Sequence, residues 1–400
     1  MAEAIGRIID FNAGRDPQRL ELKYRAMRAS TFAFMRGTCH LFYDRLPRGG
    51  VFKSAPAVWV CGDLHLENFG SYKGDNRLVY FDINDFDESA LAPASWDLVR
   101  LLTSIRIAAD TSHIDSSDAQ SLCEACLQAY GDSLAEGKAY WVERETAQGL
   151  VRALFERLEG RQRAAFLDSR TVLKRGKRRL RIDGKKALPA TDAERSAVRA
   201  FMEAFASAQK DPGFYTVLDV ANRIAGTGSL GVDRYVILVQ GKGSPDGNYL
   251  LDLKRALPSA LSSHLKLGQP AWPSEAHRVA SLQQLLQAVS IAFLHPVMVG
   301  EKPFVLRALQ PAEDRVVLTG VQHSALQLHE LVSTLGRIAA WAQLRSGGRG
   351  GSAIADELIE FARRRKWKEH LLDASIDCAA GVMKDAAAFN AAWDDGRFGR

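Results

Sequence analysis

The 400-residue sequence lacks long apolar runs, a cysteine framework and an excess of one charge spread along the chain. No apolar run approaches the roughly 18 residues that a membrane helix needs, and the first residues lack the parts of a signal peptide. The five cysteines include one C-x-x-C, Cys123 and Cys126, which falls in a helical pattern without the second pair of a zinc site. We therefore expect a cytoplasmic protein with no membrane partner and with buried thiols.

Positive charge is concentrated in residues 170–186, which hold nine Lys or Arg and one Asp. Because the net charge of the whole chain is only +6, the remainder is slightly acidic, and a nucleic-acid partner is not indicated. The alternation around Asp183 and Gly184 predicts a twisted basic hairpin. Such a hairpin either protects a sheet edge from aggregation or docks an acidic partner, a phosphate or RNA, and we favour the first interpretation.

Hydrophobic spacing predicts an α+β chain in which a β-rich unit stands between two helical blocks. Apolar residues recur every three or four positions over 16–46, from 95 to about 168 and again over 192–209, as they do in helices. Short strands are predicted at 57–62 and 77–83, and five more between 214 and 311. The predicted division is a first part of a large lobe, a small β-rich lobe and a helical second part of the large lobe, at residues 1–210, 211–318 and 319–400.

Polar side chains directly follow two of the predicted strands. The stretch VWVCGDLHLENFGSY, residues 58–72, offers Asp63 to orient or deprotonate a hydroxyl and Asn68 to hold a divalent metal. The stretch VYFDINDFDES, residues 79–89, carries three aspartates that leave the second strand: Asp82, Asp85 and Asp87. Mg²⁺ prefers such hard oxygen ligands, and acids this close repel one another unless a cation lies between them.

A glycine-rich stretch, IAGTGSLG, comes much later, at residues 224–231, and LLDLKRA follows on the next strand but one. Gly226, Gly228 and Gly231 let backbone N–H groups close over phosphates, and Lys254 places a positive charge on them. Each signal alone also fits a plain hairpin or a surface lysine. Together with the two acidic stretches they fit metal-assisted phosphoryl transfer from a nucleotide.

The acidic stretches, continued by DFDESALAPASWDLVRLL, resemble the aminoglycoside phosphotransferase and choline kinase branch of the protein-kinase-like superfamily. Asp85 and Asp97 are twelve positions apart, as are the metal aspartate and the helix aspartate of that branch. This register favours Asp85 over Asp82 as the metal ligand. The whole chain also resembles an uncharacterised bacterial family, domain of unknown function 2252, through STFAFMRGT, GDLHLENFG, FDINDFDES and RSGGRGG.

The resemblance implies a two-lobed kinase-like fold with a catalytic large lobe and a nucleotide-binding small lobe, using ATP and Mg²⁺. The implied roles are a catalytic base, Asp63; a histidine that braces the catalytic loop, His65; Mg²⁺ ligands, Asn68 and Asp85; a phosphate loop, Gly226, Gly228 and Gly231; and a lysine for the α- and β-phosphates, Lys254.

The sequence departs from the resemblance in three respects. The catalytic loop precedes the glycine loop, so we predict a circular permutation with the small lobe inserted into the large one. Cys61 stands where the branch usually has histidine. Glu275 is the only acid in the helix after Lys254, and it either pairs with that lysine or caps its own helix. Asp252 is a further candidate partner of Lys254.

The expected function is phosphorylation of a hydroxyl on a small molecule that the sequence does not identify. Two alternatives keep the nucleotide: transfer of AMP to a protein, and a nucleotide-binding pseudoenzyme or adaptor. Arg36, Arg345 and Arg349 are placed either to reach substrate or phosphate, or to stand in solvent at helix ends.

Overall fold

Helices and antiparallel strands make up the computed structural model, which describes residues 2–311, 314–316, 323–364 and 366–398. The described strands form four sheets, of six, three, two and two strands. The predicted α+β class is therefore confirmed. None of the described helices has the length and apolar character that a membrane span requires.

The six-stranded sheet has the spatial order β12–β13–β11–β10–β9–β8. Its bounds are β8 (Ala187–Pro189), β9 (Val217–Arg223), β10 (Arg234–Val239), β11 (Tyr249–Arg255), β12 (His295–Val299) and β13 (Lys302–Ala308). Strands β9 to β13 coincide with the five strands predicted between residues 214 and 311. Strand β8 was not predicted, because three residues give too short a pattern.

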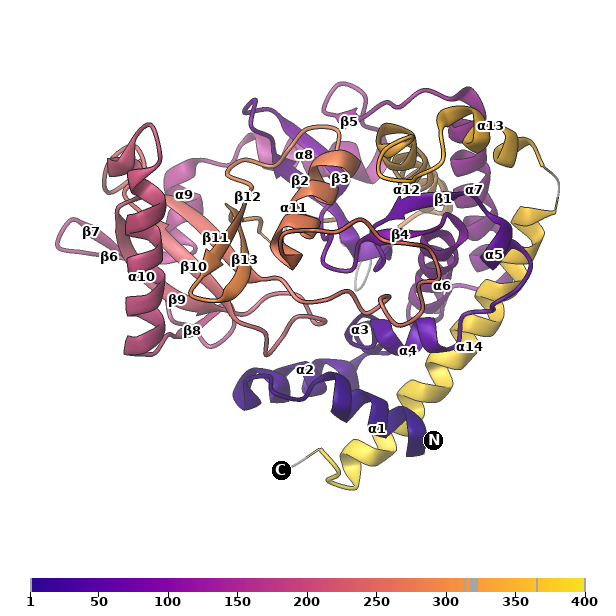
Figure 1. Ribbon diagram of the computed structural model, residues 1–400, viewed down its shortest axis with the longest axis horizontal. Coiled ribbons are helices and arrows are strands. Elements are labelled where there is room, and N and C mark those ends of the chain that lie inside the picture. The colour runs from indigo at the N-terminus through magenta and orange to yellow at the C-terminus, as the bar shows by residue number, and fades with distance from the viewer. Residues whose placement is uncertain (1, 312–313, 317–322, 365, 399–400) are drawn as a thin grey trace.

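Both faces of this sheet are covered, so strand β10 is buried at every position. On one face, Tyr235 and Ile237 pack in a cluster with Val198 of helix α10 (Asp192–Ser207), which stands beside the sheet in Figure 1. On the other face, Val236 and Leu238 share a cluster with residues of α9 (Arg163–Asp168), β7 (Lys177–Leu180) and β8, namely Leu167, Leu180 and Ala187. The alternation along β10 thus sends successive side chains into two different cores.

The predicted boundary between residues 210 and 211 falls within the packed unit around this sheet. Helices α9 and α10 and the basic segment precede residue 211, and they pack against strands that follow it. The other predicted boundary, between 318 and 319, lies outside the described residues. Strands β6 (Thr171–Lys174) and β7 form the predicted basic hairpin, but their turn is at Arg175 and Gly176. The turn predicted at Asp183 and Gly184 is wrong for this hairpin; those residues instead lead from β7 into β8.

Six of the other helices pack against one another in a helical block, most of it at the end of the molecule away from α10 (Figure 1). They are α6 (Ser95–Thr111), α7 (Ser116–Glu136), α8 (Gly149–Glu159), α12 (Ala325–Ser346), α13 (Ala355–Arg363) and α14 (Trp367–Asp394). Helix α12 packs along α7, and α14 along α6. The predicted helical region at 16–46 divides into α2 (Pro17–Ala29), α3 (Thr31–Gly37) and α4 (Cys39–Asp44). The first break falls at Ser30, whose side chain caps α3 by accepting the backbone N–H of Ala33.

Short strands and helices join the helical block to the six-stranded sheet. Helix α12 contacts both the pair β1 (Ala57–Val60) and β4 (Ala90–Pro93) and the sheet β2 (Phe69–Lys73), β3 (Val79–Ile83) and β5 (Val142–Glu143), through β1 and β3, and helix α11 (Glu275–Leu286) contacts β12 and β13. The remaining helical elements are α1 (Ala2–Phe11), α5 (Val51–Ser54), η1 (Leu66–Asn68) and η2 (Pro212–Tyr215). Helix α1 packs on α14, so the first and last described helices meet.

The contact between α7 and α12 requires glycine at position 336. A Cβ on Gly336 would lie 2.2 Å from the backbone oxygen of Cys126 on α7. We predict that Gly336→Ala lowers the free energy of unfolding by about 1 to 3 kcal/mol, because the helices must separate. Urea unfolding measures this loss. Gly6→Ala is the matched control, since its Cβ meets no atom within 4 Å and helix propensity favours alanine; an equal loss in both variants would contradict the prediction.

Candidate functional site

A cavity of about 230 Å³ lies between the loops that follow β1 and β3 and the loop that joins β9 to β10. We call it the site cavity. Five predicted site residues line it: Asp63, His65, Asp85, Gly226 and Gly228. The fold therefore brings the stretch at residues 58–72, the acidic stretch at residues 79–89 and the glycine loop around one space.

A buried arginine holds Asp63. Arg100 lies on α6, and its Nε donates a hydrogen bond to Asp63 Oδ1 at 2.7 Å, while its Nη2 donates to the same oxygen. The Arg100 side chain has no exposed surface, whereas that of Asp63 is 23% exposed. Burial raises the pKa of Asp63, and the charge of Arg100 limits that rise. The other oxygen, Oδ2, stands outside this pair, 3.9 Å from His65 Nε2.

The turn before Asp63 is fixed from two sides. Gly62 has a φ of +80°, and a Cβ there would lie 2.2 Å from the carbonyl oxygen of Glu88, so the turn requires glycine. Asp97 on α6 accepts the backbone N–H groups of Gly62 and of the preceding residue at 2.9 and 2.8 Å. Tyr43 Oη donates to the Gly62 carbonyl at 2.6 Å. These bonds set the direction in which Asp63 leaves the backbone.

His65 and Asn68 brace the same loop. His65 Nδ1 accepts the backbone N–H of Glu67 at 3.1 Å, and burial with nearby arginines lowers the pKa of His65 well below its usual value, so the ring is neutral at pH 7. Asn68 Nδ2 donates to the backbone carbonyls of Asp63 and Asp85, at 3.1 and 3.2 Å. Among the described residues no donor reaches Asn68 Oδ1, although this atom is buried.

Lys254 links the six-stranded sheet to the acidic stretch. Its side chain is 5% exposed, and its Nζ lies 3.3 Å from Asp85 Oδ1 and also pairs with Asp87. Burial opposes ionisation of Asp85, but the charges of Lys254 and Arg307 outweigh it and lower the pKa of Asp85 to about 2. The Asp85 carboxylate, which is 45% exposed, is therefore ionised at neutral pH and open to the cavity.

Asp82 and Glu275 make other contacts. Asp82 is buried in β3, where Oδ2 pairs with Arg345 of α12 at 3.1 Å and accepts the backbone N–H of Ala288 at 3.0 Å. Glu275 pairs with Arg278 one turn along α11, at 2.6 Å. Of the two interpretations of Glu275, its contacts therefore fit the one in which it acts within its own helix. Asp82 fastens β3 to the helical block.

Asp252 does not compete for Lys254, because three arginines surround it. Arg223, Arg234 and Arg307 come from β9, β10 and β13 and lie 2.8, 2.7 and 3.6 Å from Asp252 Oδ2. We call this group the arginine cluster. The Asp252 side chain has no exposed surface, so the cluster is a buried excess of positive charge behind the site.

The N-terminal segment holds the glycine loop. Arg15 Nη1 donates to the carbonyls of Gly228 and Leu230, at 2.7 and 3.0 Å, and the fully buried Lys23 donates to the Gly228 carbonyl at 3.2 Å. Gly231 has a φ of +88°, and a Cβ there would lie 2.8 Å from Arg15 Cβ. Gly226 and Gly228 thus line the cavity, whereas Gly231 packs against the N-terminal segment.

The three arginines singled out from the sequence lie in three different places. Arg36 lines the site cavity and pairs with Glu67. Arg345 pairs with Asp82, and the carbonyl of Arg349 accepts the Trp59 indole N–H at 2.8 Å.

A family described as "Uncharacterized protein conserved in bacteria (DUF2252)" matches residues 15–392, which include every residue of the site described above. The chain belongs to this family. No curated protein and no solved structure matches the chain. Any activity proposed for this DUF2252 chain therefore rests on the contacts within its own candidate site.

Few side chains of the site are suited to bind a metal ion. Within the described ranges, no group of three or more His, Cys, Asp or Glu side chains is placed to hold a metal. Mg²⁺ in nucleotide sites needs fewer protein ligands, since one or two carboxylates act together with substrate phosphates and waters. Asp85 and the unpartnered Asn68 Oδ1 are of the right chemical type for such a site.

Several residues of the site were missed in the sequence, among them Arg100, Arg15 and Glu88. A lone arginine in the apolar helix stretch WDLVRLLTSI was the signal for Arg100, because a buried charge needs a partner. Nothing local marks Arg15, whose partners follow more than 200 positions later. Glu88 lines the cavity and accepts the backbone N–H of Ala260.

Glu88 makes a testable contribution to stability. Burial, aided by the charges of Asp63 and Asp87, raises the pKa of Glu88 from 4.5 to about 7. Between these values the folded protein keeps a proton that the unfolded chain releases, so this group's contribution to stability falls as pH rises from 4.5 to 7. We predict a weaker fall in Glu88→Gln, measured by urea unfolding at pH 5 and pH 8.

The matched control is Glu203→Gln, which removes one exposed carboxylate from α10. Because Glu203→Gln removes a carboxylate far from the buried site, a weaker fall found only in Glu88→Gln is attributed to the buried position of Glu88. The same fall in Glu88→Gln as in the unmodified protein would contradict the raised pKa.

Proposed function

We propose that this chain is an ATP- and Mg²⁺-dependent phosphotransferase with a kinase-like, circularly permuted fold, acting on a hydroxyl group of a small molecule. The observation that carries the proposal is the composition of the site cavity. A carboxylate suited to a base, a second carboxylate suited to a metal and a glycine loop meet there, and a buried lysine lies beside the second carboxylate. These are the parts that phosphoryl transfer uses for positioning and charge stabilisation.

Asp63 is suited to accept or orient the proton of an attacking hydroxyl. Its raised pKa brings it closer to neutral pH than an exposed aspartate, which favours general-base catalysis. Arg100 holds the carboxylate through Oδ1 and leaves part of the Asp63 side chain exposed. In this proposal Arg100 is a positioning residue, because it acts through Asp63.

Asn68 and Asp85 would hold the metal ion. Bound Mg²⁺ would neutralise phosphate oxygens during transfer. Asn68 keeps its Oδ1 uncommitted while its Nδ2 ties the loops of Asp63 and Asp85 together, so the two acidic segments stay in register. Asp85 remains ionised through the physiological range. Lys254, which pairs with Asp85 and Asp87, would donate hydrogen bonds to phosphate.

The order of elements within the β-rich unit supports the kinase-like assignment. The glycine loop joins β9 to β10, Lys254 lies on β11, and helix α11 follows, which is the succession of the corresponding protein-kinase parts. The catalytic loop and the acidic stretch with Asp85 come before all of these elements in the chain. Helices α1 and α14 contact each other. This contact is compatible with a permutation, because the two ends that a cut creates come from neighbouring positions in the unpermuted fold.

Phosphate release from labelled ATP tests the proposal. With Mg²⁺ and a panel of small hydroxyl compounds, we expect release or transfer of the γ-phosphate that falls about 100-fold or more in Asp63→Asn. Asp373→Asn, an exposed position on α14, is the matched control and should keep full activity. Melting temperatures establish that each variant folds.

Other outcomes would separate the alternatives. Label from the α-phosphate on a protein acceptor would indicate AMP transfer, and ATP binding without turnover would indicate a nucleotide-binding adaptor. Equal turnover in Asp63→Asn and the unmodified protein would contradict the role of Asp63.

A further inference from the structure

Two basic side chains of the N-terminal segment meet at the glycine loop. Arg15, which follows α1, lines the site cavity together with Gly226 and Gly228. Lys23 of α2 is fully buried, and it donates to the same Gly228 carbonyl as Arg15 does. Neither side chain has a part in the phosphoryl transfer proposed above.

The partners of these two side chains are uncharged. Arg15 Nη1 donates to two carbonyls of the glycine loop, and Lys23 Nζ donates to Asn12 Oδ1 at 2.7 Å and to one of the same carbonyls at 3.2 Å. The centre of the Phe11 ring lies 5.3 Å from the Arg15 guanidinium carbon and 5.6 Å from Lys23 Nζ. Within the part of the chain that the structure describes, neither side chain forms an ion pair with a carboxylate.

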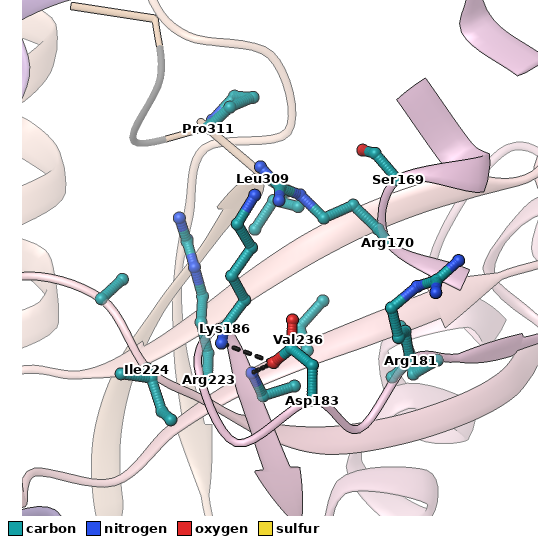
Figure 2. Close-up of a pocket in the computed structure, with 13 residues that line it drawn as sticks. Ser169, Arg170, Arg181, Asp183, Lys186, Arg223, Ile224, Val236, Leu309 and Pro311 are labelled. Atoms are coloured by element: carbon teal, nitrogen blue, oxygen red, sulfur yellow. Dashed lines mark hydrogen bonds between the residues drawn. The ribbon is translucent and has the colours of Figure 1, made fainter. Parts of the chain in front are cut away.

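Other buried arginines around the loop do have a carboxylate partner. Arg223, at the end of β9 (Figure 2), and Arg234, at the start of β10, flank the loop and share Asp252. Arg19 of α2 pairs with Asp16 at 3.2 Å. Arg15 and Lys23 differ from these neighbours in lacking a counter-charge, and buried charge without one is costly.

The acid whose charge acts most on both side chains is Glu88, which also lines the site cavity. Glu88 forms no ion pair with either of them among the described residues, and because its own pKa is raised to about 7 it carries only part of a charge at neutral pH. Burial lowers the pKa of Arg15, and burial together with the charge of Arg15 lowers the pKa of Lys23 well below its usual value. An anion beside Arg15 would supply a counter-charge and favour the charged form of Lys23.

We propose that Arg15 binds a phosphate group beside Gly228 in the site cavity, with Lys23 as a second positive charge behind it. The inference rests on the proposed function, under which this phosphate belongs to the nucleotide. A guanidinium group matches phosphate oxygens in charge and geometry, and within the described residues Arg15 Nε and Nη2 donate no hydrogen bond. The N-terminal segment, residues 15–23, thereby completes the phosphate site that the glycine loop and Lys254 begin.

Isothermal titration of the full chain, with Mg²⁺ in excess, tests this contact with two probes, ATP and inorganic tripolyphosphate. We expect both probes to bind the unmodified protein and to bind Arg15→Gln at least about tenfold more weakly, because that variant loses a charged donor to phosphate. Arg25→Gln is the matched control, since it removes the same charge from an exposed arginine of α2 that pairs with Glu21. We expect both probes to bind it within about twofold of the unmodified protein.

Two further variants separate the charge of Arg15 from its support of the loop. Arg15→Lys keeps the charge and should lose less affinity than Arg15→Gln; equal losses would mean that only the bonds to the loop carbonyls matter, and would overturn the proposal. Melting temperatures establish that each variant folds. If Arg15→Gln does not fold, Lys23→Met carries the test: a loss of about threefold or more for both probes supports the proposal, and unchanged binding contradicts it.

The two probes distinguish a failure of this inference from a failure of the proposed function. ATP binding that is equal in Arg15→Gln and the unmodified protein would overturn the inference and leave the proposed function standing. Tripolyphosphate binding that depends on Arg15, without any binding of ATP, would support the phosphate contact and contradict the proposed function. No binding of either probe to the unmodified protein at about 10 mM would contradict both.

Discussion

The ion pair of Lys254 with Asp85 and Asp87 is the contact on which the candidate site depends. Lys254 is almost fully buried on β11, and a buried ammonium group is tolerated only beside a counter-charge. The carboxylates come from the loop after β3, so the ion pair fixes the six-stranded sheet relative to the segment that carries the candidate site residues. Asn68 then extends this link to Asp63 through two backbone carbonyls.

Local sequence patterns revealed the site residues that lie within one stretch. Asp63, His65 and Asn68 follow a strand within a few positions of one another, and short apolar runs between turn residues indicated β9 to β13. The supporting partners could not be found in this way. Arg15 and Arg100 belong to segments whose own patterns are ordinary, and only the tertiary fold brings them to the glycine loop and to Asp63.

Two differences between sequence and structure have clear physical causes. Asp183 and Gly184 carry the strongest turn signal of the basic segment, yet the hairpin turns at Arg175 and Gly176, because pairing Leu180 with Thr171 places Leu180 in the core beneath the sheet. Glu275 was a candidate partner of Lys254 on helix position alone. Glu275 instead pairs with Arg278, one turn away on the same helix. Lys254 pairs with Asp85 and Asp87, which come from the loop after β3.

Isothermal titration with ATP, with and without Mg²⁺, tests most directly whether the site cavity is a nucleotide site. The account predicts Mg²⁺-dependent binding to the unmodified protein and loss of that metal dependence in Asp85→Ala, where Asp87 still pairs with Lys254 and preserves the fold. Identical titrations of both proteins, or no binding of ATP at roughly millimolar concentration, would contradict it.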